Sequence, residues 1–221
     1  MTTISFFLCL TTIAAAGALQ SPRILLHSLL KRIFGSLIFA LALLPVFIDW
    51  PDSIKTFGLP FIFNNWIAGV SMVLSVAIVI LNSFTASTAG NLATYPQIRR
   101  QVWSLAHVLQ SSLAWIVYLA LYEVVFRGVF FFTSVRLLGF WPAAFLNIAA
   151  YSLAHLIKNK REAFLSIPFG ALTIYLTWAS GSCWYAVLVH IVLAISHEWS
   201  SIRANPNMRF EFSFTERNSS L

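Results

Sequence analysis

Apolar side chains dominate seven separate segments of the chain, and polar or turn-forming residues interrupt the runs between them. A transmembrane helix needs roughly 17–25 predominantly apolar residues, which is about the length of these segments. The pattern therefore predicts an all-α integral membrane protein with about seven transmembrane helices in one bundle. We expect these helices at about residues 4–19, 33–49, 61–83, 109–133, 140–157, 163–180 and 184–199.

The amino-acid composition indicates the same class of protein. Of the 221 residues, 59% are hydrophobic and 10% are charged, whereas soluble domains carry about 25% charged residues. The net charge of +7 suits orientation in the bilayer and contact with anionic lipid, so we expect no nucleic-acid partner. Cys9 and Cys183 lie in or beside apolar segments without metal-ligand spacing, and we expect packed thiols, no metal and no cofactor.

The first apolar segment resembles a secretory signal peptide, because its AAAGA sequence is similar to a small-residue cleavage site. No Lys or Arg precedes the segment, whereas the first region of a signal peptide is normally basic. We therefore interpret residues 4–19 as a spanning helix. Lys and Arg are concentrated in alternate connecting segments, which the positive-inside rule assigns to the cytoplasm. This pattern predicts an external N-terminus and a cytoplasmic C-terminus.

The longest connecting segment, residues 84–108, is rich in Gly, Ser and Thr. It predicts a cytoplasmic loop with a short helix that starts after Pro96. The segment after Ile202 is mixed and polar, and we expect it to be flexible or bound to a partner. We divide the chain into N-terminal membrane helices with their loop (1–103), a core of membrane helices (104–199) and a cytoplasmic tail (200–221).

Four titratable groups lie well inside the predicted spans: Glu123, Arg127, His155 and His190. A charged side chain at the bilayer centre costs about 3 kcal/mol on insertion scales, so each charge needs a partner. Glu123 and Arg127 lie four residues apart on one helical face in YEVVFRG, where they can form a purely structural ion pair. A lone histidine in a membrane usually makes a hydrogen bond between helices, which is the structural alternative for His155 and His190.

Two histidines, a carboxylate and a guanidinium on three different spans favour a shared polar cavity. These groups suit general acid–base catalysis on a water molecule, with a further donor for the oxyanion. Hydrolysis of a peptide bond inside the membrane is the reaction that they serve best. A zinc site is disfavoured, because the sequence has no H-E-x-x-H motif.

The ordered motifs YEVVFRG, YSLAH and VLVHIVLAI resemble the CAAX-protease and bacteriocin-processing family, also called the Abi or glutamic intramembrane protease family. The family pattern is E-E-x-x-x-R, F-x-x-x-H and H-x-x-x-N on three core helices, and the resemblance covers about residues 104–199. It implies a bacterial inner (plasma) membrane protein that cleaves membrane-associated substrates. The residues that match the catalytic motifs are Glu123, Arg127, His155 and His190.

Two positions depart from the family pattern. Tyr122 replaces the first glutamate, which is implicated in activating the attacking water, and Ala194 replaces the asparagine thought to help stabilise the oxyanion. A phenol is a poor general base at neutral pH. Glu123 lies about 100° further around the helix and cannot simply take the place of the missing glutamate. His197 lies on the face of Ala194, one turn further along.

Two hypotheses follow from these motifs. In the first, the chain is an endopeptidase of this family with weakened activity, in which Arg127 orients Glu123 as the acid–base carboxylate. His155 and His190 then position the water or the oxyanion. In the second, the chain is an inactive pseudo-protease that serves as a scaffold or as a partner-binding subunit for another membrane protein. A proton-coupled transporter is disfavoured, because the sequence has no internal repeat.

Overall fold

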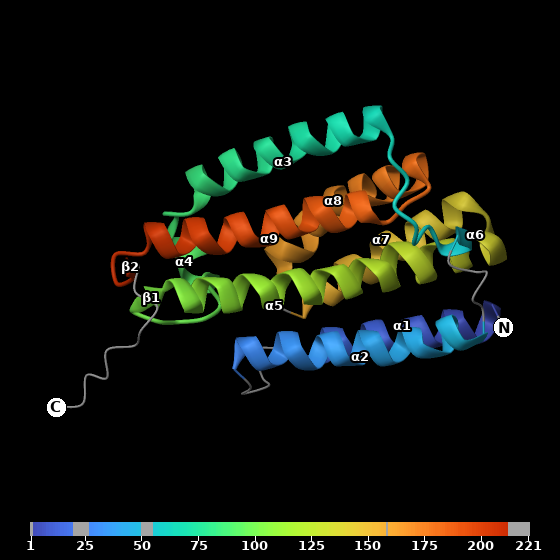
Figure 1. Ribbon diagram of the computed structural model, residues 1–221, viewed down its shortest axis with the longest axis horizontal. Coiled ribbons are helices and arrows are strands. Elements are labelled where there is room, and N and C mark those ends of the chain that lie inside the picture. The colour runs from blue at the N-terminus through green and yellow to red at the C-terminus, as the bar shows by residue number, and fades with distance from the viewer. Residues whose placement is uncertain (1, 20–26, 50–54, 158, 212–221) are drawn as a thin grey trace.

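The computed structural model describes residues 2–19, 27–49, 55–157 and 159–211, without the side chains of residues 2–6 and 45–49. Within these ranges the long helices lie side by side as one bundle (Figure 1). The elements in chain order are α1 (Thr2–Leu19), α2 (Ser28–Asp49), α3 (Asn65–Thr85), α4 (Ala89–Thr94), β1 (Val102–Ser104), α5 (Leu105–Glu123), the π-helical segment η2 (Val124–Phe130), α6 (Phe131–Leu138), α7 (Phe140–Leu156), α8 (Lys160–Ser180), α9 (Trp184–Ala204) and β2 (Arg209–Glu211).

The prediction of an all-α membrane bundle is confirmed, and each predicted apolar segment lies largely within a helix. Among the described residues, four helices are long and apolar enough to cross a bilayer: α3, the continuous helix Leu105–Leu138, α8 and α9. Large apolar side chains cover the outside of the bundle, with Trp66 and Phe84 of α3 being 71% and 79% exposed. The chain is therefore an integral membrane protein whose outer surface suits lipid.

Helix α5 runs through the middle of the bundle, between α9 on one side and α2 on the other (Figure 1). Helix α3 packs against α9 at one edge, and the α1–α2 pair forms the opposite edge. An aromatic cluster joins α2, α5 and α7, with ring centroids of neighbouring members about 5.5–6.1 Å apart: Phe39, Tyr118, Tyr122 and Tyr151. This cluster fixes how α5 faces its neighbours.

The predicted short helix after Pro96 is wrong, because helix α4 precedes the proline and ends at Thr94. Proline disfavours the helical region for the residue before it, and Tyr95 is extended with φ −124° and ψ 151°. Asn91 holds α4 against the bundle, since its Nδ2 atom donates to Ser201 Oγ of α9 at 2.9 Å. The loop therefore covers this end of α9.

The first part of the predicted tail, up to Glu211, has regular secondary structure. Helix α9 continues to Ala204, and strand β2 pairs in parallel with β1 in the register Val102 with Arg209. Residues 212–221 lie outside the described residues.

Helix α5 changes to π-helical geometry at Val124, within the YEVVFRG motif. All seven residues of η2 are buried, and π-helical turns occur frequently at functional sites. Gly128 allows a close approach here, because a Cβ atom at this position would lie 2.9 Å from Leu59 Cδ2 and 3.2 Å from the Phe57 carbonyl oxygen. This packing holds the turn that carries Arg127.

Candidate active site

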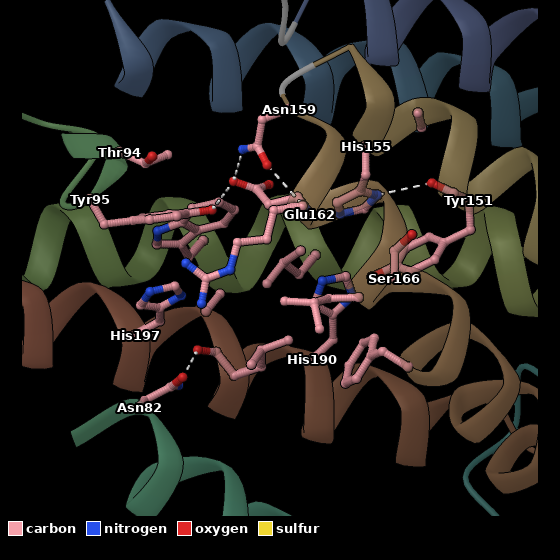
Figure 2. Close-up of a pocket in the computed structure, with 18 of the residues that line it drawn as sticks. Asn82, Thr94, Tyr95, Tyr151, His155, Asn159, Glu162, Ser166, His190 and His197 are labelled. Carbon is pink, nitrogen blue, oxygen red and sulfur yellow. Dashed lines mark hydrogen bonds between the residues drawn. The ribbon is translucent and has the colours of Figure 1, made fainter. Parts of the chain in front are cut away.

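A cavity of about 610 Å³ lies between α5, α7, α8 and α9, and the loop that follows α4 closes one side of it (Figure 2). Two of the predicted site residues, His155 and His190, line the cavity. Glu123 and Arg127 do not line it. The four predicted residues are therefore divided between the cavity wall and a buried layer behind it.

Glu123 binds two of the predicted partners in this buried layer. Its Oε1 atom lies 2.5 Å from His190 Nδ1, and its Oε2 atom lies 3.6 Å from Arg127 Nε. The side chains of Glu123 and Arg127 are fully buried. A buried charge requires a close partner of opposite charge. Glu123 and Arg127 are such partners for each other.

Arg127 also joins η2 to two other helices. Its Nε atom donates to Thr173 Oγ1 of α8 at 2.9 Å, and its Nη1 atom donates to Asn147 Oδ1 of α7 at 2.8 Å. Asn147 Nδ2 in turn donates to the Phe126 carbonyl oxygen at 2.9 Å. The guanidinium lies 4.8 Å from the Tyr151 ring centroid, within the range of a cation–π contact. Arg127 is therefore fixed in one orientation.

The two histidines have different Nδ1 partners. His190 Nδ1 faces the Glu123 carboxylate, whereas His155 Nδ1 lies 2.9 Å from the Tyr151 carbonyl oxygen one turn earlier in α7. A carbonyl oxygen only accepts hydrogen bonds, so His155 Nδ1 carries the proton and Nε2 keeps the lone pair in the neutral ring. The structure thus brings Glu123, Arg127 and His190 into contact, while His155 lies with His190 on the cavity wall.

The two positions that depart from the family pattern both line the cavity. The Tyr122 ring stacks on Phe126 at 4.4 Å and contacts the His190 ring edge-on at 5.8 Å. Its hydroxyl is buried and makes no hydrogen bond within the described part of the chain. At Ala194 the wall presents only a methyl group. The cavity therefore lacks the carboxylate and the amide that the family motif would supply at these positions.

A second polar group lies at the other side of the cavity and was missed in the sequence. Glu162, in the first turn of α8, accepts hydrogen bonds at Oε1 from Tyr95 Oη at 3.1 Å and from Asn159 Nδ2 at 2.9 Å (Figure 2). Burial and the nearby Glu162 carboxylate raise the pKa of Tyr95 above its ordinary value, so Tyr95 stays protonated and donates. His197 stacks on Tyr95 with ring centroids 4.2 Å apart and hydrogen-bonds Asn91.

A second buried ion pair, Arg32 with Glu198, was also missed. Arg32 Nη2 lies 2.8 Å from Glu198 Oε2, and the two residues are 1% and 2% exposed. Ser111 and Trp115 of α5 hydrogen-bond the same carboxylate. In the sequence Arg32 stands at the start of one predicted span and Glu198 near the end of another. Nothing in the sequence indicates that these two residues are partners.

A comparison with known protein families finds a match over part of the chain. Residues 101–196 match the family model described as type II CAAX prenyl endopeptidase Rce1-like. The match contains all three motifs and confirms the resemblance to the CAAX-protease and bacteriocin-processing family over this segment. No curated protein and no solved structure matches the chain.

Proposed function

We propose that the chain is an intramembrane endopeptidase with weakened activity, which hydrolyses a peptide bond in a membrane-associated protein. One observation carries the proposal: His190 lines the cavity while the buried Glu123 carboxylate holds its Nδ1 atom at 2.5 Å. A histidine oriented by a buried carboxylate is a recurrent part of hydrolytic sites. The match to the endopeptidase family model supports the same reaction class.

In this reaction His155 accepts the proton of the attacking water at Nε2, and the water oxygen bonds to the peptide carbonyl carbon. His190, held at Nδ1 by the Glu123 carboxylate, donates from Nε2 to the oxyanion. The carbon–nitrogen bond then breaks, and the leaving amine takes the proton from His155. Glu123 orients His190 and is not itself the acid–base group, because it does not line the cavity. Arg127 fixes Glu123.

The activity is weakened because the cavity lacks two family groups. Removing one oxyanion donor typically lowers kcat about 10²–10³-fold, and Ala194 supplies no donor where the family has asparagine. Tyr122 supplies no carboxylate to the attacking water. We therefore expect slow turnover of the substrate.

The test compares peptide termini in membranes from cells with wild type, Glu123→Gln, and the double variant His155→Ala with His190→Ala, at matched expression. We expect a cleavage product in wild type that is lost in both variants. Glu211→Gln, on the exposed strand β2, is the matched control and keeps the product. Identical termini in all samples would contradict peptide hydrolysis.

The alternative is a catalytically inactive pseudo-protease that holds a segment of another membrane protein in the cavity. The complete burial of Glu123 and Arg127 favours it, because a sealed ion pair can serve packing alone. The discriminating variant combines Tyr122→Glu with Ala194→Asn, which restores both family residues. Cleavage by this variant and none by wild type would support the alternative.

The proposal includes a bacterial inner membrane location with the C-terminus in the cytoplasm. The alternation of Lys- and Arg-rich segments supports this orientation. Single cysteines at Glu211 and at Thr56, which lie on opposite sides in the proposed topology, test it in intact cells. A membrane-impermeant thiol reagent should modify the cysteine at position 56 and spare the one at 211. The reverse labelling would overturn the orientation.

A further inference from the structure

Asn82 brings an amide to the cavity from α3, outside the segment that matches the family model. Asn82 lines the cavity and is 8% exposed, whereas Leu81 and Phe84 beside it are 62% and 79% exposed. A polar side chain within a spanning helix is costly, so it normally has a structural or a functional partner. The hydrogen bonds of Asn82 show which of its atoms have a structural role.

The nitrogen of the Asn82 amide joins two helices. Its Nδ2 atom donates to the Leu193 carbonyl oxygen at 3.1 Å and to Ser196 Oγ at 2.7 Å, both on α9. Figure 2 shows Asn82 reaching α9 from α3 at the edge of the cavity. A carbonyl oxygen only accepts hydrogen bonds, so the contact with Leu193 fixes the nitrogen as the end of the amide that faces α9. The two bonds use both hydrogens of the amide.

The oxygen of the same amide is open. Asn82 Oδ1 accepts no hydrogen bond from the residues that the structure describes, and it is not among their sealed polar atoms. An amide oxygen can accept two hydrogen bonds. The packing of α3 against α9 therefore explains only the donor half of the Asn82 amide, and the acceptor half is left for a ligand in the cavity.

The position of Asn82 along α9 fits an extended peptide bound in the cavity. Its two partners follow His190 by three and six residues, which is a rise of about 4.5–9 Å along the helix. An extended peptide advances about 3.3 Å per residue. When the carbonyl of the cleaved bond lies at His190, a backbone N–H about one to three residues away therefore reaches the level of Asn82.

We infer that Asn82 is a substrate-binding residue, whose Oδ1 atom accepts a backbone N–H of the peptide segment in the cavity and holds that segment in register with His190. This inference rests on the proposed function. The family has an amide on α9 where this chain has Ala194, whereas here an amide reaches the cavity from α3. Asn82 serves as an acceptor for the substrate and takes no part in proton transfer. The contact is the same in the bound substrate and in the transition state, so its loss raises KM and leaves kcat nearly unchanged.

The test measures kcat and KM of the purified full-length protein in lipid nanodiscs, on the peptide whose termini identify the cleavage. Asn82→Ala should raise KM about 3–10-fold, which corresponds to the loss of one neutral hydrogen bond, with kcat nearly unchanged. Ser83→Ala is the matched control, because Ser83 is an exposed residue of the same helix whose hydroxyl donates to the Val79 carbonyl oxygen. This control should keep the wild-type KM.

N-methylation of the peptide separates substrate binding from a structural role of Asn82. One backbone N–H at a time is methylated within about three residues of the cleaved bond. We expect one position that raises KM of the wild type about as much as Asn82→Ala does, and that has no further effect in Asn82→Ala. An unchanged KM in Asn82→Ala, or independent effects at every methylated position, would overturn this inference while the proposed function stands. If the wild type cleaves no peptide, both are overturned.

Discussion

Arg32 of α2 and Glu198 of α9 form an ion pair 2.8 Å long that is almost completely buried, although 166 residues separate them along the chain. The Arg32 guanidinium also lies 3.9 Å from the Trp115 ring centroid on α5. Three helices therefore meet at one charged contact in the part of the bundle next to the cavity.

Replacing either Arg32 or Glu198 alone should strongly destabilise the bundle. Removal of one partner of a buried ion pair typically costs about 3–5 kcal/mol, because the other charge stays buried. We expect that loss for Arg32→Met and for Glu198→Leu, measured by reversible unfolding in mixed micelles. The double variant should recover part of it. Additive losses in the double variant would argue against the pairing.

Arg127→Lys should destabilise the chain although the charge is kept. A lysine cannot donate to Thr173 and Asn147 from two nitrogens of a planar group while it contacts Glu123. We expect a loss of about 2–3 kcal/mol in the same unfolding measurement, from two lost hydrogen bonds to a charged group. Arg136→Lys, at an exposed position, is the matched control and should stay near wild type.

Gly128→Ala should perturb the π-helical turn. The added methyl group would meet Leu59 Cδ2 at 2.9 Å and the Phe57 carbonyl oxygen at 3.2 Å, and overpacking of this kind costs about 1–3 kcal/mol. Gly69→Ala in α3 is the control, since the added methyl would meet no atom within 4 Å. Comparison of the two unfolding midpoints checks the prediction, and equal midpoints would refute it.

Asn159→Ala should cost more than Asn64→Ala, although both residues cap a helix. Each side chain accepts from a backbone N–H three residues later, and such a cap contributes about 1 kcal/mol. Asn159 also donates to the Glu162 carboxylate, which adds about 1 kcal/mol or more. The difference in unfolding free energy between the variants measures this second bond. No difference would mean that Asn159 acts only as a cap.

Hydropathy was sufficient to predict the membrane helices, because apolar runs long enough to cross a bilayer are rare in soluble proteins. The contacts between helices were harder to predict. Arg32 directly precedes the predicted span 33–49, where hydropathy alone gives no reason to expect burial, yet the structure buries it against Glu198. The contact between Tyr95 and Glu162 was missed, since nothing in the sequence near either residue indicates that Tyr95 folds back onto Glu162.

The motif residues could be found because titratable groups are rare inside predicted spans, and their spacing then matched a known pattern. Spacing correctly paired Glu123 with Arg127, but His190 became their neighbour through helix packing that no local pattern contains. The π-helical geometry of Val124–Phe130 was not predicted from the hydropathy pattern either.

The π-helical segment also decides how the fold would respond to the deletion of a single residue. An α-helix turns about 100° per residue, so a deletion in α5 would rotate every later side chain of α5–α6 to a new neighbour. A π-helical turn holds one residue more than the α-helical turn that it replaces. Loss of one codon between Val124 and Phe130 could therefore be absorbed by return to α-helical winding, with α6 still facing its present neighbours. Residues 124–130 would then lose the π-helical geometry that now places Arg127 next to Asn147 and Thr173. The helix bundle would survive the deletion, but the hydrogen bonds of Arg127 would not.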